Sequence, residues 1–140
     1  MEEGMSFTMR ELTDAEKDEF LKNNFWGILC FGGDEPYGIP LGYEYGNGNV
    51  ILGLSHTGRK MECVKRSRKV CLTICTPTSL SPNPREAYPF TSVIIDGELE
   101  EIAEADRASY GLGPLPPGLK VVSFVLKQKR VGTMRSGSGS

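Results

Sequence analysis

The run Gly46-Asn47-Gly48-Asn49 constrains the fold more than any other feature, because it separates two segments that look like strands. Glycine and asparagine adopt positive φ at low cost, and the two central residues of the tightest hairpin turn require that conformation. The flanking segments, 37–45 and 50–54, are rich in the aromatic and branched residues that favour strands. We therefore expect a tight antiparallel hairpin here.

Further strands are expected on both sides of the hairpin. The apolar segment 25–31 comes before it and ends at a glycine-rich turn, so that three consecutive strands would form a meander. After it, three segments follow strand patterns: 70–75, 90–102 and 121–126. The second of these contains Asp96-Gly97, where we expect a bend. Six short strands in 140 residues favour a small, mostly antiparallel β-barrel, with an open sandwich as the alternative.

Short helices are expected between these strands. Thr13-Asp14-Ala15-Glu16 is a capping box, which predicts a helix that ends near Asn24. Ser55 and Thr57 offer hydroxyl groups that could cap a second helix, which would end near Arg66. A weaker helical pattern covers 104–110. These helices are too short to form a core alone, so they would flank the sheet.

Composition indicates one globular domain over residues 1–134, followed by a flexible Gly/Ser tail at 135–140. The formal net charge is −2, which gives no overall attraction to nucleic acid or to an anionic membrane. The N-terminal Met1-Glu2-Glu3 is acidic where a signal peptide would be basic and then apolar. We therefore expect a cytoplasmic protein with no membrane or nucleic-acid partner.

The cysteines and the single histidine give little support to a metal site. The sequence has four cysteines without a CxxC motif, namely Cys30, Cys63, Cys71 and Cys75. In a reducing compartment we expect all four to be reduced, small core residues. His56 lies beside the predicted start of the second helix, where a surface or capping role is expected ahead of a functional one. The sequence thus predicts no metal.

The aromatic residues fall into two groups, one expected in the core and one expected on a binding surface. Phe25, Trp26 and Phe31 are expected in the core. Three tyrosines share one face of a predicted strand, Tyr37, Tyr43 and Tyr45. They could stack on a ring system or fill a dimer interface, and the interface is the preferred interpretation.

The basic residues are concentrated around the second predicted helix. Six of the sixteen lie within eleven residues: Arg59, Lys60, Lys65, Arg66, Arg68 and Lys69. Those near the end of the helix are stabilised by its dipole and need no ligand. Arg59 and Lys60 lie in the first turn, where the dipole disfavours cations. With Ser55, Thr57 and the open backbone of Gly58 they would cradle a phosphate monoester. The alternative is two exposed side chains that extend into solvent.

The run from Pro36 to Tyr45, continued through the hairpin to Ser55-His56-Thr57-Gly58-Arg59-Lys60, resembles the FMN-binding split barrels related to pyridoxamine 5′-phosphate oxidase. Within them it is most similar to the small proteins grouped with nitroimidazole-resistance proteins. The similarity is strong over 24–101 and rests on element order elsewhere. The resemblance implies a mainly β, six-stranded antiparallel split β-barrel with flanking short helices. It also implies a homodimer with FMN at the interface.

The resemblance also implies a set of cofactor-binding residues. Arg59 and Lys60 would bind the FMN phosphate, with Ser55 and Thr57 nearby. The remaining implied contacts are the backbone of Ile39, Pro40 and Leu41 along the isoalloxazine edge, Gly53 and Leu54 in the same pocket, and Ser92. Relatives of the nitroimidazole type often carry a histidine where this chain has Gly53-Leu54. The basic residues that hold the substrate phosphate in a true pyridoxamine-phosphate oxidase have no match in 111–118 or the tail.

The function implied by the resemblance is an FMN-dependent oxidoreductase. Reduced FMN would pass electrons to a small acceptor, for example a nitroaromatic, with NAD(P)H as a candidate reductant. No side chain is assigned a catalytic role. A second hypothesis is a flavin-binding carrier or sensor without turnover. A third is a β-barrel that binds oligonucleotides, which the acidic charge and the lack of an aromatic and basic stripe disfavour.

Overall fold

The computed structural model describes residues 7–77 and 89–138, which form a mainly β protein with short helices. The strands are β1 (Phe7–Arg10), β2 (Trp26–Phe31), β3 (Tyr37–Gly42), β4 (Glu44–Gly46), β5 (Asn49–Ser55), β6 (Lys69–Pro77), β7 (Phe90–Glu101) and β8 (Val121–Ser138). The helices are α1 (Asp14–Asn23), α2 (Arg59–Arg66) and the 3₁₀ helix η1 (Glu104–Tyr110). All three helices lie where the sequence predicts them.

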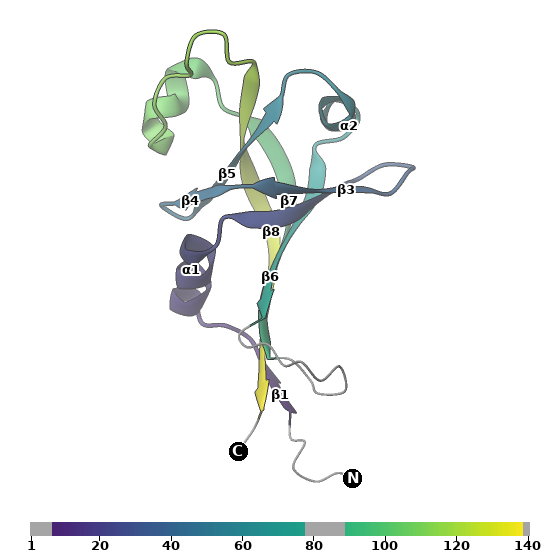
Figure 1. Cartoon of the computed structure of the whole chain (residues 1–140), viewed down its shortest axis with the longest axis vertical. Coiled ribbons are helices and arrows are strands. Elements are labelled where there is room, and N and C mark those ends of the chain that lie inside the picture. The colour runs from purple at the N-terminus through teal and green to yellow at the C-terminus, as the bar shows by residue number, and fades with distance from the viewer. Residues whose placement is uncertain (1–6, 78–88, 139–140) are drawn as a thin grey trace.

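The strands form one antiparallel sheet in the order β3-β2-β6-β7-β8-β5-β4, and β1 pairs with the far end of β8. The two ends of this order, β3 and β4, are separated in the chain only by Tyr43, so the sheet curls back on itself into a half-barrel (Figure 1). The prediction of a mainly β, antiparallel barrel is therefore confirmed. The described residues contain eight strands rather than the six predicted.

The predicted hairpin is present between β4 and β5. Asn47 and Gly48 have φ values of 52° and 76°, as a two-residue turn of this kind requires. The predicted meander is confirmed in its two antiparallel pairings, but its middle strand is not continuous, because the segment 37–45 breaks at Tyr43. β3 pairs with β2, whereas β4 pairs with β5. Tyr43 is buried at this break, and its amide donates to the Phe25 carbonyl at 2.9 Å.

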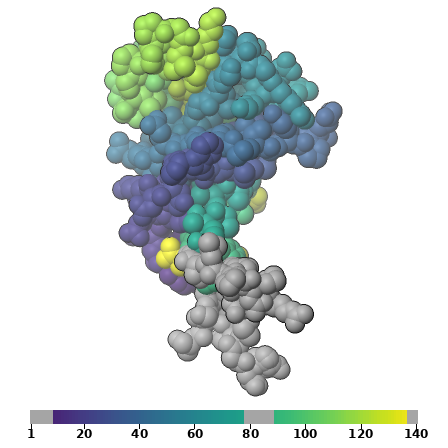
Figure 2. All heavy atoms as spheres, viewed as in Figure 1, coloured from purple at the N-terminus to yellow at the C-terminus, as the bar shows by residue number. Residues whose placement is uncertain are grey.

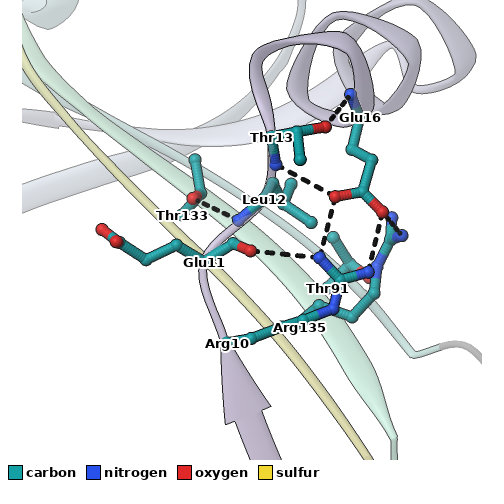
Figure 3. Close-up of polar contacts among 8 residues, drawn as sticks. All are labelled: Arg10, Glu11, Leu12, Thr13, Glu16, Thr91, Thr133 and Arg135. Atoms are coloured by element: carbon teal, nitrogen blue, oxygen red, sulfur yellow. Dashed lines mark hydrogen bonds and ion pairs between the residues drawn. The ribbon is translucent and has the colours of Figure 1, made fainter.

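The N-terminal helix α1 begins at the predicted capping box. The Thr13 hydroxyl accepts from the Glu16 amide at 3.2 Å, and the Thr13 amide donates to the Glu16 carboxylate at 3.0 Å. The same carboxylate accepts from Arg10 at 2.7 and 2.8 Å and from Arg135 at 3.0 Å (Figure 3). The bonds with Arg10 first, and then those with Thr13, lower the pKa of Glu16 to about 2. One carboxylate thus joins β1, α1 and β8.

Strand β8 continues far beyond the predicted 121–126 and includes most of the predicted tail. Arg135 pairs with Arg10 and Ser136 with Met9, and the Ser136 side chain is buried. The expected flexible tail at 135–140 is therefore corrected, because 135–138 belong to β8 and only 139–140 lie outside the described residues. In Figure 1 the ends of β1 and β8 lie together, far from α2.

The bend predicted in the fifth strand is a β-bulge in β7. The pairing of β7 with β8 shifts register between Asp96 and Gly97. A Cβ on Gly97 would lie 2.1 Å from the carbonyl oxygen of Lys127, so only glycine permits this approach. The sequence therefore located the bulge correctly.

The core fills the inside of the half-barrel, and the outer face of β2, β6 and β7 stays open. Phe31 is buried as expected, but Phe25 and Trp26 are 65% and 57% exposed. Cys63 is buried, whereas Cys30 and Cys75 are exposed, so the prediction that all four cysteines are core residues is wrong for these two. Alternation along a strand sends every second side chain outward, and no described element covers that face.

Candidate functional site

The predicted phosphate cradle lies where β5 leads into α2. Arg59 and Lys60 are the first two residues of α2 and are exposed, as predicted. The predicted caps are wrong, because Gly58 is the N-cap with φ of 105° and no side chain caps the helix. Ser55 and Thr57 precede the helix with exposed side chains. The first turn of α2 therefore offers backbone N–H groups and two cations to solvent.

The Arg59 guanidinium is held over an aromatic ring. It lies 3.8 Å from the centroid of the Tyr37 ring, which stacks on Phe31 with a centroid distance of 5.6 Å. The Glu35 carboxylate is 4.0 Å away, and both side chains are exposed. The contact with Tyr37 brings the start of α2 beside the start of β3. Sequence spacing alone did not predict it.

A cavity of about 360 Å³ lies between α2 and the turn that joins β2 to β3. Both arginines of α2 contribute to its lining. The lining residues are Gly32, Gly33, Asp34, Glu35, Tyr37, Arg59, Cys63, Arg66 and Ser67. Among the described contacts Lys60 makes no ion pair. Lys60 is thus the cation of the first turn without an ion pair among the described residues, although Glu62 lies in the same turn.

The residues predicted to line the flavin ring divide into inward and outward positions. Ile39, Leu41 and Leu54 have buried side chains, so only their backbone faces the site. Pro40 and Gly53 are exposed on β3 and β5. Because β5 runs directly into α2 and Arg59 touches Tyr37 of β3, the structure brings these residues to one side of the barrel.

Ser92 is the exception among the predicted cofactor residues. It lies on the outer face of the sheet, where β7 pairs it with Cys75 and Met134. It is six residues from Glu98, which pairs with Lys69 just after α2. At about 3.3 Å per strand residue that is about 20 Å along β7. Within one chain Ser92 is therefore well separated along β7 from the strand pair that follows α2.

His56, Tyr43 and Tyr45 form hydrogen bonds with other parts of the chain. The exposed His56 donates its amide to the Lys120 carbonyl at 3.2 Å, which agrees with the surface role expected. The Tyr43 hydroxyl donates to the Leu21 carbonyl at 2.9 Å, and burial raises its pKa to about 12. The Tyr45 hydroxyl donates to the Asp18 carboxylate. The preferred interface role is therefore wrong for Tyr43, which is buried; Tyr45 also contacts α1 but stays partly exposed, so for it the interface role remains a prediction.

A second cavity, of about 460 Å³, was not anticipated from the sequence. It is lined by Phe25, Trp26, Gly42, Tyr43, Glu44, Ile51, Leu52, Gly53, Arg107, Leu112 and Ser123. Arg107 is its only cation, and the side chain is 9% exposed. One sequence feature could have pointed to Arg107: it is the only basic residue between Glu86 and Leu119, in an otherwise acidic stretch.

The sequence profile of the pyridoxamine 5′-phosphate oxidase family matches residues 13–116, from the cap of α1 to the loop before β8. The chain belongs to this family. No curated protein sequence matches it. The match includes the hairpin, the start of α2 and Arg107, so the resemblance found from the sequence is confirmed at the level of the pyridoxamine 5′-phosphate oxidase family.

Solved structures of similar proteins have the same fold. A FAD-binding protein from Mesorhizobium loti has 19% identity and a TM-score of 0.70, with 95% of this chain and 100% of that chain covered. A candidate 5-nitroimidazole antibiotic resistance protein from Bacteroides thetaiotaomicron has 17% identity and a TM-score of 0.73, with 94% and 90% covered. A FAD-binding protein from Mycobacterium smegmatis has 20% identity and a TM-score of 0.65, with 93% and 99% covered.

Neither a metal site nor a membrane-spanning helix is found among the described residues of this family member. No group of three or more histidine, cysteine, aspartate or glutamate residues could hold a metal ion there. No helix in the described parts of the chain is long and apolar enough to cross a membrane. The features described above as a candidate site are the start of α2, the outer side of β3 and β5, and the cavity beside Arg107.

Proposed function

We propose that this protein binds FMN, with the phosphate at the start of α2 and the isoalloxazine ring along β3 and β5. The observation that carries the proposal is the pair Arg59 and Lys60 in the uncapped first turn of α2, which contacts β3 through Tyr37. A phosphate there would accept from backbone N–H groups and from two cations. Family membership and the FAD-binding names of the similar structures support a flavin.

The present contacts of Arg59 leave it available to a phosphate. A cation over an exposed aromatic ring gains about 0.5–1 kcal/mol, and an exposed ion pair at 4.0 Å gains little. A charge-assisted hydrogen bond to phosphate is worth about 1.5–3 kcal/mol. Arg59 would therefore turn from Tyr37 toward the ligand. Lys60 has no such contact to give up.

A homodimer is the second part of the proposal. Ile28, Ile94 and Met134 are 44%, 42% and 39% exposed on the outer face of the sheet, together with Cys30 and Cys75. Exposed apolar residues that follow neighbouring strands are typical of a protein interface. A second copy of the chain on this face would bury them. It would also bring Ser92, which lies on the same face, toward the cofactor of the other protomer.

The proposed reaction class is flavin-dependent oxidoreduction. When bound, the flavin would supply electron transfer from NAD(P)H to a small acceptor, of which a nitroaromatic is the candidate suggested by the resemblance to resistance proteins. The chain would contribute the phosphate cradle, the backbone of β3 along the ring edge and the small outward surface of Gly53. These groups bind and orient, and none of them donates a proton.

The visible spectrum of the purified protein tests this proposal. We expect saturable uptake of FMN with a shifted flavin absorption band, followed by anaerobic bleaching with NADH or NADPH and recovery with a nitroaromatic. Parallel titration with FAD distinguishes the two flavins. A protein that takes up neither flavin refutes the proposal. Bound flavin that NAD(P)H never reduces supports the carrier or sensor hypothesis instead.

A further inference from the structure

Arg107 is a buried cation without a carboxylate partner among the described residues. Its side chain is 9% exposed, although arginine is rarely buried unless it is paired. Nε donates to the Gly113 carbonyl at 2.8 Å and Nη1 to the Ser123 hydroxyl at 2.7 Å. Both acceptors are neutral, and no described hydrogen bond uses Nη2. The positive charge, in the last turn of η1, is therefore buried against neutral acceptors without a described counter-charge, which is costly.

The cavity of about 460 Å³ lies directly against this guanidinium. In Figures 1 and 2, η1 and the loop after it lie at the end of the molecule opposite β1. Phe25 and Trp26 also line the cavity, and both rings are more than half exposed. A cavity that combines aromatic rings with one convergent charged group is typical of a small-molecule site.

The charges around the cavity limit what it can hold. Arg107 is the only cation and Glu44 the only anion among its lining residues, and Glu44 is exposed. A ligand with one negative charge would compensate Arg107, whereas a doubly charged phosphate would meet stronger repulsion from Glu44. The planar guanidinium also matches the geometry of a carboxylate.

We propose that this cavity binds a small planar aromatic carboxylate, with its ring against Phe25 and Trp26 and its carboxylate on Arg107. The cavity includes Gly53, which is also one of the predicted flavin contacts, so the ligand would lie next to the flavin. The role of this ligand as a second substrate rests on the proposed function. Its binding does not, because none of the groups that hold it belongs to the flavin.

Trp26 makes the proposal directly testable, because it is the only tryptophan in the chain. Benzoate titrated into the full-length protein, first without flavin and then with FMN, should change the Trp26 fluorescence saturably. Benzamide has the same ring without the charge and should bind at least about tenfold more weakly, because it lacks the charge-assisted bond. Equal affinity for benzoate and benzamide would overturn the proposal.

Two variants and a control locate the charge. Arg107→Gln should reduce benzoate affinity at least about tenfold and leave benzamide affinity unchanged. Arg130→Gln removes the same charge from an exposed residue that pairs with Asp96, and should bind benzoate like the original chain. Glu44→Gln leaves the hydrogen bonds of Arg107 intact and should bind benzoate more tightly, so the test does not depend on how well Arg107→Gln folds. Benzoate affinity unchanged in Glu44→Gln and in a folded Arg107→Gln would refute the site.

Flavin uptake is measured separately on the same proteins. Benzoate binding without FMN uptake would retain this inference and refute the proposed function. FMN uptake with no preference for benzoate over benzamide would refute this inference and support the proposed function.

Discussion

Removal of the two cations at the start of α2 is the most direct test of the phosphate cradle. Lys60 has no described ion pair, so a bond from it to phosphate would contribute its full value of about 1.5–3 kcal/mol. Arg59 must leave the Tyr37 ring, at about 0.5–1 kcal/mol, so it contributes less. The double variant Arg59→Ala with Lys60→Ala should lose about 2.5–5 kcal/mol, or about 60-fold to 4,000-fold in FMN affinity.

The same substitutions should not destabilise the fold, which separates loss of binding from loss of structure. Cations are unfavourable in the first turn of a helix, and alanine is the best helix former. Loss of the Arg59–Tyr37 contact, worth about 0.5–1 kcal/mol, offsets part of this gain, so the thermal midpoint of the double variant should stay close to that of the original chain. Lys65→Ala is the matched control, because Lys65 lies in the last turn of the same helix. It should cost a few tenths to 1 kcal/mol of stability and leave FMN affinity unchanged.

Quenching of FMN fluorescence during titration with protein measures the affinity, and circular dichroism on heating measures the stability. Wild-type affinity in the double variant would show that the phosphate binds elsewhere. A loss of affinity as large in Lys65→Ala would show that the helix responds to its total charge rather than to the two residues of its first turn.

Three further predictions concern the fold and its assembly. The pKa of Glu16 is lowered to about 2, so its bonds stabilise the fold above the usual carboxyl pKa, and this stabilisation is lost as pH falls from about 5 to about 2. The free energy of unfolding, measured with urea, should therefore fall more over this range for the original chain than for Glu16→Gln. Gly97→Ala should lower the free energy of unfolding by at least about 1–3 kcal/mol, since its Cβ would lie 2.1 Å from the Lys127 carbonyl oxygen. In the control Gly46→Ala the new Cβ would meet no atom within 4 Å, so the substitution should cost less than about 1 kcal/mol. Light scattering should give a dimer for the original chain and a monomer for Ile94→Asp, which puts a charge on the exposed apolar face; a monomeric original chain would contradict the proposed dimer.

Features that depend on a few neighbouring residues could be predicted from the sequence. Asn47 and Gly48 alone determine the turn conformation, and Thr13 with Glu16 determines where α1 begins. The place of Arg59 and Lys60 in the first turn follows from the spacing between β5 and α2. In each case the deciding contact lies within a few positions in the chain, so local chemistry is sufficient.

Features that depend on distant strands could not be predicted from the sequence. A Gly/Ser sequence beyond 134 becomes strand only because β1 pairs with it, and the two segments stand at opposite ends of the chain. The resemblance implies one site for Ser92 and the phosphate cradle, yet Ser92 lies on the outer face of β7 and the cradle at the start of α2. Two residues predicted as core, Phe25 and Trp26, lie outside because the curl of the sheet decides which face is covered.

Local sequence was enough to predict a chain of short antiparallel strands, its tightest turn, its helix starts and a cluster of cations suited to one phosphate. What those cations touch depends on the folded chain, since Arg59 meets Tyr37 where the start of α2 lies beside the start of β3. The tertiary structure also buried Arg107 beside an aromatic cavity, where its charge has no described partner. The physical reason is that backbone conformation is governed by near neighbours, whereas burial and pairing of charge depend on segments that meet only when the sheet closes.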